Sequence, residues 1–161
     1  YILFQKIFKI IFYTLHIFMV YISFIFVLST NLFSKKQQKN FFLGGLITAN
    51  MVKDDKLEIN FGKVNSLKIN TAEILSSDAS ISRYLANYKP ELQLYGKTPL
   101  EEIEVNHWIS FAIGPLTCSK QFEKSLQYLD YSLSSFSYLV GHQLTIADFA
   151  VWGALFCKFG N

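Results

Sequence analysis

The chain has 161 residues, enough for one domain or for two small lobes that share a core. Its net charge is +3: residues 1–53 contribute +6 from six lysines with no acidic residue, and the remainder contributes −3 from nine basic and twelve acidic residues. The excess of basic residues therefore lies outside the globular part, and it gives no argument that the globular part binds nucleic acid. Cys118 and Cys157 have no metal or redox spacing; they indicate a reducing compartment and are expected to be small core residues.

Residues 1–42 form an apolar segment of low complexity, which we expect to lie outside the fold. From Ile10 to Leu28 there is no charged residue, and nineteen helical residues would cross a hydrocarbon core of about 30 Å. However, 31 of the first 43 residues are types encoded by codons made only of A and T: Phe, Ile, Lys, Tyr, Asn and Leu. We therefore favour translated non-coding sequence joined to an exon near Phe41, with a transmembrane helix as the alternative. An ordinary signal peptide fits less well, because the segment is long, aromatic and without a small-residue cleavage site.

Residues 43–88 predict a small α/β lobe. Residues 43–52 predict a short helix with apolar Leu46, Ile47 and Val52. Residues 56–62 and 66–70 alternate between apolar and polar side chains around a turn at 62–65, which predicts a β-hairpin. Residues 76–88 predict a second helix that begins with capping serines and places Ile81, Tyr84 and Leu85 on one face.

Residues 89–97 hold two of the three prolines and predict a linker, and residues 98–161 predict an all-α lobe. Thr98 suits the N-cap of a helix over 98–114, Pro99 suits its first position, and Glu101 completes a capping box. The expected buried stripe of this helix is Ile103, His107, Trp108, Phe111 and Ala112. A further helix is expected over 119–138, with Phe122, Leu126, Leu129 and Leu133 at helical spacing. The predicted fold class is thus α+β.

The stretch "HQLTIADFAVWGAL" (142–155) admits a chemical and an architectural interpretation. His142 and Asp148 resemble an acid/base pair, but no nucleophile or metal ligand accompanies them. Thr145 and Asp148 have the three-residue separation of a capping box, in which the Thr145 hydroxyl accepts from the Asp148 amide and the Asp148 carboxylate accepts from the Thr145 amide. We therefore predict a structural cap at the start of a helix that is buried nearly all round.

This box after "YLVG" resembles the C-terminal lobe of glutathione-transferase-like proteins, and "SISRYLA" resembles the last helix of their thioredoxin-like lobe. Taken in order, "VKDDKLEI", "SISRYLA", "LYG" and "EVNHWISF" resemble the N-terminal domain of metazoan glutamyl-prolyl-tRNA synthetases. The resemblance covers about residues 43–161. It implies a truncated thioredoxin-like α/β lobe over 43–88 and an incomplete transferase-like C-terminal lobe over 98–161.

The resemblance implies a domain without chemistry of its own, which docks a cytoplasmic ligase onto other transferase-like domains of a multisynthetase complex. No catalytic residue, cofactor or metal is then expected in this chain; ATP and tRNA would be bound by ligase domains that it lacks. Transferase-like domains pair through the helix over 77–87. Its period leaves four residues at or near the surface as candidate partner-binding residues: Ser80, Arg83, Tyr84 and Asn87.

Two alternatives stay open. A catalytic glutathione transferase would hold the γ-glutamyl group with a Glu/Gln-Ser pair where this chain has Ser77 and Asp78, and the Asp78 charge would repel that carboxylate. The expected cis-proline and the first strand with its activating residue are also missing from the sequence. A membrane-anchored protein with a transferase-like domain is the second alternative, and it requires residues 10–28 to be genuine protein.

Overall fold

A computed structural model of the chain describes residues 43–54, 58–60, 66–69 and 73–159. In chain order these ranges contain helix α2 (Leu43–Val52), strands β1 (Glu58–Asn60), β2 (Ser66–Lys68) and β3 (Ile74–Leu75), helix α3 (Asp78–Tyr88), the 3₁₀ helix η2 (Pro90–Leu92), and helices α4 (Pro99–Ile113), α5 (Phe122–Leu133) and α6 (Ile146–Phe159). The predicted order, a small α/β part followed by helices alone, is confirmed.

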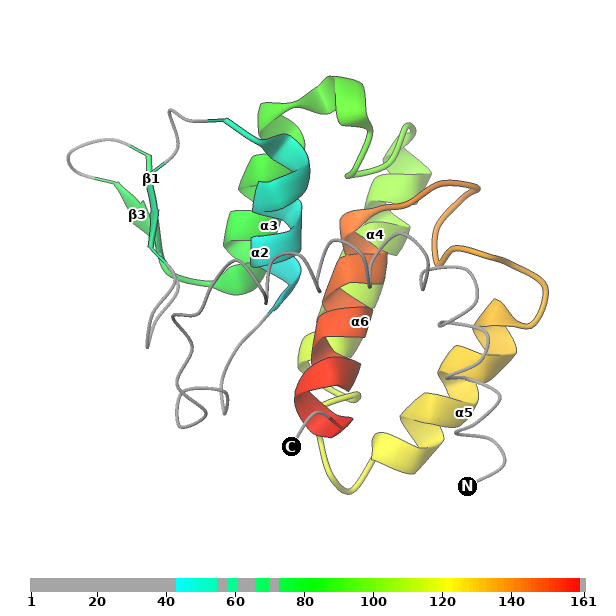
Figure 1. Ribbon diagram of the computed structural model, residues 1–161. Coiled ribbons are helices and arrows are strands. Elements are labelled where there is room, and N and C mark those ends of the chain that lie inside the picture. The colour runs from blue at the N-terminus through cyan, green and yellow to red at the C-terminus, as the bar shows by residue number, and fades with distance from the viewer. Residues whose placement is uncertain (1–42, 55–57, 61–65, 70–72, 160–161) are drawn as a thin grey trace.

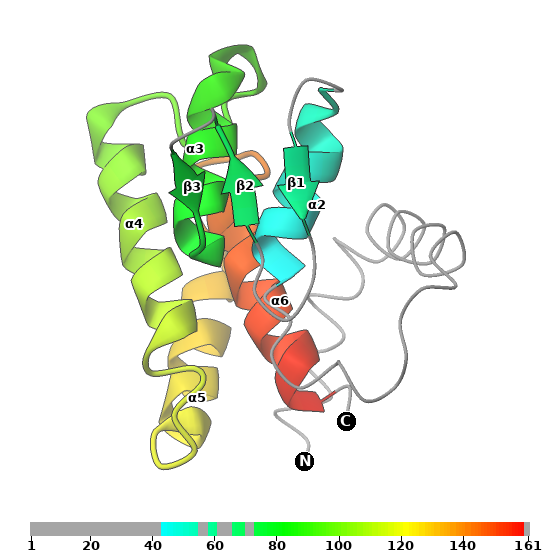
Figure 2. The ribbon, with the colours of Figure 1, turned by 90° about the vertical axis from the view of Figure 1, so that its left-hand side faces the viewer.

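The elements are arranged in layers. Figure 1 shows the sheet at one side, α2 and α3 beside it, α4 and α6 next, and α5 at the far side. Figure 2, turned by 90°, shows the sheet in front of α2 and α3. Helix α2 packs against both α3 and α6, so it joins the α/β part to the helical part.

The predicted hairpin is present. Strands β1 and β2 pair antiparallel with Glu58 opposite Lys68 and Asn60 opposite Ser66. Leu67 of β2 is completely buried, as the alternation predicts, whereas the predicted strand positions 57 and 61 lie outside the described residues. A third strand, β3, pairs antiparallel with β2 and was not predicted, because a strand of two residues is too short to show alternation.

Helix α2 approaches its neighbours closely because it begins with two glycines. A Cβ on Gly45 would stand 2.6 Å from Oδ1 of Asp78, and a Cβ on Gly44 would stand 3.5 Å from Cα of Ala150 in α6. The absent side chains let α2, α3 and α6 meet at one place. The predicted apolar residues of α2, Leu46, Ile47 and Val52, are all buried.

The face of α4 that is turned toward the core differs from the prediction. The Thr98 hydroxyl accepts from the Glu101 amide at 3.2 Å and Pro99 lies in the first turn, both as expected. The Glu101 carboxylate, however, accepts from the Lys97 amide at 2.6 Å and not from the Thr98 amide, as the predicted capping box would require. However, Ile103 is 66% exposed and His107 is exposed, so both were wrongly placed in the buried stripe. The stripe consists of Val105, Trp108, Ile109, Phe111 and Ala112. Apolar residues occur on most faces of α4, so the pattern alone did not fix its rotation.

The segment over 89–97 is built into the fold. Leu94 is only 3% exposed, and its carbonyl accepts from the Ile146 amide at 2.9 Å. The Gln143 side chain donates to the Gln93 carbonyl at 2.9 Å, so this segment is held at the start of α6 by two bonds.

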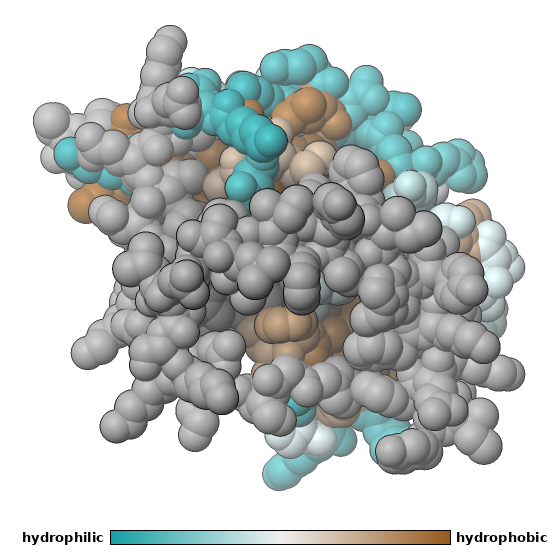
Figure 3. All heavy atoms as spheres, viewed as in Figure 1, coloured by the Kyte–Doolittle hydropathy of each residue, from teal (hydrophilic) through white to brown (hydrophobic). Residues whose placement is uncertain are grey.

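Helices α5 and α6 also differ in detail from the prediction. The α5 helix is shorter than predicted, and of its predicted apolar face Leu129 is buried while Phe122, Leu126 and Leu133 are half-buried. On α6, Trp152 is half-buried and stacks on Phe156, which is 48% exposed, so this helix is not buried all round. In Figure 3 apolar side chains show over the lower half of α6, while hydrophilic residues gather along the upper rim.

Among the helices described, none combines the length and the apolar character needed to cross a membrane. The apolar run over 10–28, on which the transmembrane alternative depends, lies outside the described residues.

Candidate functional site

The outer face of α3 carries the four residues predicted to bind a partner. Asn87 is exposed and its side-chain amide donates to the Arg83 carbonyl at 2.9 Å. Ser80, Arg83 and Tyr84 are half-buried. The helical period therefore placed all four on the face turned away from the core, although three of them are partly covered.

Arg83 lies against α4. Its Nε donates to Oδ1 of Asn106 at 2.8 Å, and the Tyr95 hydroxyl contacts the same Oδ1 at 3.0 Å and Nδ2 of Asn106 at 2.8 Å. Asn106 Nδ2 also donates to the Glu102 carbonyl one turn earlier in α4, at 2.9 Å. These bonds connect α3, the segment before α4, and α4 itself. Sequence reasoning missed Tyr95 and Asn106, because contacts between residues 11 and 23 positions apart leave no periodic signal.

Tyr84 takes part in a local aromatic contact. Its ring stacks on Tyr88 with centroids 6.2 Å apart. A hydrogen bond to Asp54, two residues after the end of α2, raises the pKa of the Tyr88 hydroxyl. Tyr84 also packs against the edge of the core, so its ring is partly committed to the fold.

Two apolar residues on the turns of α4 before Asn106 are largely exposed. Leu100 and Ile103, on α4, are each 66% exposed, and Ile103 lies one turn before Asn106, the residue that Arg83 contacts. We use "α3–α4 surface" for the six residues Ser80, Arg83, Tyr84, Asn87, Leu100 and Ile103. The surface combines a cation, aromatic and amide groups and two aliphatic side chains, a composition suited to binding another protein.

Asp78, which was compared from the sequence with a ligand-binding position of transferases, makes a hydrogen bond within the fold. Its carboxylate accepts from the Gly45 amide at 2.9 Å and so closes the N-terminus of α2. Ser77 is the N-cap residue of α3, but its side chain makes no cap hydrogen bond, so the prediction of capping serines was wrong. The amides at this helix junction are thus partly satisfied by the protein's own carboxylate.

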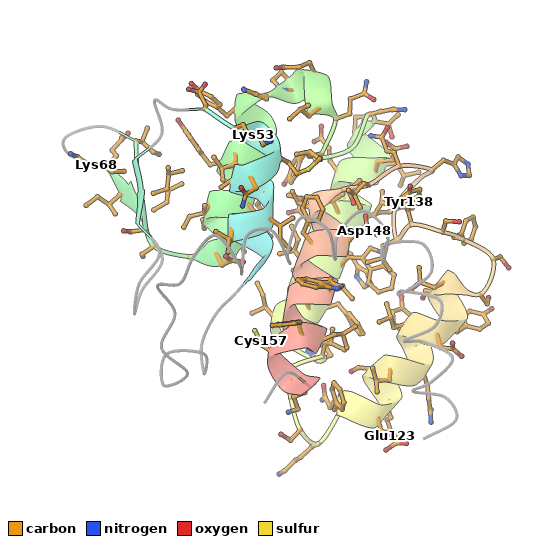
Figure 4. All side chains as sticks on the ribbon, in the orientation of Figure 1. Lys53, Lys68, Glu123, Tyr138, Asp148 and Cys157 are labelled. Carbon is orange, nitrogen blue, oxygen red and sulfur yellow. The ribbon has the colours of Figure 1, made fainter. Side chains whose placement is uncertain are left out.

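At the start of α6, Asp148 accepts from the Thr145 amide at 2.9 Å and from the Thr145 hydroxyl at 3.1 Å. The direction of the hydroxyl bond differs from the expectation, since Thr145 donates to the carboxylate instead of accepting from the Asp148 amide. The second carboxylate oxygen accepts from the Leu139 amide at 3.0 Å. In Figure 4 Asp148 lies at the upper end of α6, near the loop that carries Tyr138. The carboxylate thus joins that loop to α6.

Asp148 is 5% exposed, and burial raises the pKa of its carboxyl, although the hydrogen bonds from Leu139 and Thr145 lower it. His142, the other member of the acid/base pair considered from the sequence, is exposed. Both oxygens of Asp148 are occupied by groups of the fold, which is the arrangement of a structural cap.

The cysteines differ from the expectation. Cys118 is exposed and Cys157 is half-buried, so neither is a core residue. Burial, together with the nearby Asp78 charge, raises the pKa of the Cys157 thiol. Cys118 follows α4 in a turn, where a small residue need not be buried.

The fold of the described residues is similar to that of a solved protein structure. A solved structure, glutathione S-transferase unclassified 2 from Bombyx mori, matches with a TM-score of 0.57 over 70% of each chain at 18% sequence identity. No family model matches the chain. The chain therefore has the fold of a glutathione-transferase-like protein, as the sequence predicted.

The sequence is similar to parts of two kinds of larger protein. The bifunctional glutamate/proline–tRNA ligase of Drosophila melanogaster is 34% identical over 121 residues, which are 73% of this chain and 7% of that relative. A more distant match, elongation factor 1-gamma 1 of Oryza sativa, is 27% identical over 123 residues and 62% of this chain, and the match covers 29% of that relative. The predicted resemblance to glutamyl-prolyl-tRNA synthetases is confirmed, for a chain that spans a small part of such a ligase.

Proposed function

We propose that this chain is a non-catalytic protein-interaction domain of a glutamyl or glutamyl-prolyl tRNA synthetase. In this proposal it docks the ligase, in the cytoplasm, onto other transferase-like domains of a multisynthetase complex and so serves aminoacylation without performing it. ATP and tRNA would be bound by ligase domains beyond this chain. The similarity to glutamate/proline–tRNA ligases and to elongation factor 1-gamma, two kinds of translation protein, supports a module used for attachment.

The observation that carries the docking proposal is the exposure of Leu100 and Ile103 on the two turns of α4 before Asn106, the residue that Arg83 contacts. Two aliphatic residues that are each 66% exposed on one turn of α4 lose contact with water if a partner covers them. Arginine in a partly covered position is a frequent centre of binding energy, and a rim of polar groups such as Ser80 and Asn87 completes such a site.

The arrangement gives no support to the transferase alternative. The Asp78 carboxylate accepts from the Gly45 amide, and the resemblance to transferases implies that glutathione would present its own carboxylate at this position. Two like charges at such a junction disfavour binding, most strongly where they are shielded from water.

The test is recovery of synthetase-complex subunits by the immobilised chain. Ile103→Asp should lower recovery strongly, because it would place a charge in the covered patch. Ile74→Asp is the matched control, since Ile74 is 63% exposed on β3, outside the α3–α4 surface. Equal recovery by the two variants would contradict docking through this surface. Retention of the chain on a glutathione column with turnover of an electrophile would contradict the non-catalytic assignment.

A further inference from the structure

The position of Arg83 within the α3–α4 surface indicates what the partner must present. Arg83 is half-buried, and its Nε is engaged by Asn106 at 2.8 Å. Within the part of the chain that the structure describes, this is the one side-chain hydrogen bond of Arg83, so neither Nη group has a protein acceptor there. A guanidinium carries five N–H donors in a planar fork, and four of them belong to these two Nη groups.

The acceptor for Nε is itself fixed. Asn106 Oδ1 is contacted by the Tyr95 hydroxyl at 3.0 Å, and Asn106 Nδ2 is held by that hydroxyl and by the Glu102 carbonyl. The side chain of Asn106 thus cannot turn without losing several bonds at once. Arg83 is therefore held at Nε by a group that is itself immobilised, and ordering it on binding costs less than ordering an arginine that extends into solvent.

We infer that Asn106 and Tyr95 are positioning residues that hold the Arg83 guanidinium so that its Nη pair binds a carboxylate of the docking partner. An Asp or Glu side chain matches the spacing of the two Nη groups and accepts from both, and this bidentate pair is the strongest common use of arginine at an interface. The inference rests on the proposed docking function and extends it by naming the partner's group and two residues that need not touch the partner.

The chemistry of the contact is tested by changing Arg83 in two ways. Arg83→Gln removes the charge and keeps a donor, and it should weaken binding of the recovered synthetase-complex subunit by about 30-fold. Arg83→Lys keeps the charge but loses the fork, and it should weaken binding less. The dependence of log Kd on log salt should flatten for Arg83→Gln and stay near the original slope for Arg83→Lys. Equal losses with an unchanged salt slope would overturn the assignment of a carboxylate.

The positioning role is tested with Tyr95→Phe, which removes one hydroxyl and keeps the half-buried ring. We expect about three- to tenfold weaker binding in the original chain and no further loss in the Arg83→Gln background. The positioning role would be overturned if Tyr95→Phe weakened binding by the same factor in both backgrounds, or did not weaken it in the original chain.

A third measurement needs no partner. In nuclear magnetic resonance spectra of the chain, the Arg83 Nε proton should exchange slowly with water, and faster in Tyr95→Phe and Asn106→Ala. Fast exchange in the unaltered chain would overturn the positioning role whatever the partner experiments show. A different outcome is slow exchange of the Arg83 Nε proton together with normal partner binding by the Arg83→Gln variant. The side chain would then be positioned as inferred, but this surface would not be the docking site.

Discussion

Replacing Asp148 tests how much the start of α6 depends on one carboxylate. The carboxylate accepts three hydrogen bonds: from the Leu139 amide, the Thr145 amide and the Thr145 hydroxyl. Asp148→Ala would leave the Thr145 amide, in a residue 1% exposed, without its acceptor. A lost N-cap costs about 1 kcal/mol, and a buried donor left unpaired adds about 1–3 kcal/mol. Removing a buried charge offsets part of this, so we expect a net loss of about 2–3 kcal/mol.

The assay is urea unfolding followed by tryptophan fluorescence, since Trp152 lies in α6 and Trp108 in the neighbouring α4. Asp148→Asn keeps one acceptor and should lose less than Asp148→Ala. Asp130→Asn, on α5, is the control and should stay within about 0.5 kcal/mol of the original chain. If Asp148→Ala is no less stable than this control, the carboxylate does not stabilise the start of α6.

The pH dependence follows from the direction of the shift. Because burial raises the folded-state pKa of Asp148, the native chain binds more protons than the unfolded chain between the unfolded pKa and the folded pKa. The Asp148 contribution to stability is therefore greatest below the unfolded pKa and decreases as the pH rises through the folded one. The stability difference between the original chain and Asp148→Asn should consequently grow when the pH is lowered from 7 toward 4.

Three further predictions concern other parts of the fold. Gly45→Ala should destabilise the chain by about 1–3 kcal/mol despite the better helix propensity of alanine, because its Cβ would stand 2.6 Å from Asp78 Oδ1; unfolding in urea measures this. Gly96→Ala should cost at least about 1 kcal/mol in the same assay, since Gly96 has a φ of 101° and the Cβ would lie 2.8 Å from that of Glu101. Iodoacetamide should alkylate exposed Cys118 before Cys157, whose raised thiol pKa leaves less thiolate near pH 8; peptide mass mapping over time gives the order, and simultaneous labelling would contradict it.

Local signals in the sequence predicted the helices and the hairpin well. Thr98 and Pro99 mark the start of α4, and Thr145 with Asp148 marks the start of α6, since caps are formed by residues close in sequence. The burial of Leu67 in the core was predicted from the alternation of apolar and polar residues within a single strand. In each case the deciding interaction joins neighbours in the chain.

The errors arose where the deciding contact is distant in sequence. Ile103 was assigned to the core because α4 has apolar residues on most faces, and only packing against α6 decides which of them face inward. Asp78 was interpreted as a charge at the start of α3, whereas its carboxylate accepts a hydrogen bond from the amide of Gly45, 33 positions earlier. Arg83 lies on the outer face of α3, as the helical period predicted, but its bond to Asn106 spans 23 positions and was not foreseen. The sequence pattern gives no sign of the contacts of Asp78 and Arg83 with residues this far away.

The hydrogen bonds of Asp78, Asp148 and Arg83 are relevant to the function of the chain. Asp78 and Asp148 are the acidic residues that an enzymatic interpretation would choose, and each accepts from backbone amides that belong to another element or loop. A carboxylate committed in this way stabilises the fold but is a poor base, because proton transfer would break the bonds that hold it. Arg83, in contrast, uses its Nε for the fold, and among the residues that the structure describes its Nη groups have no acceptor. Of these three side chains, Arg83 therefore has donors left for the docking that we propose, on the outer surface of α3.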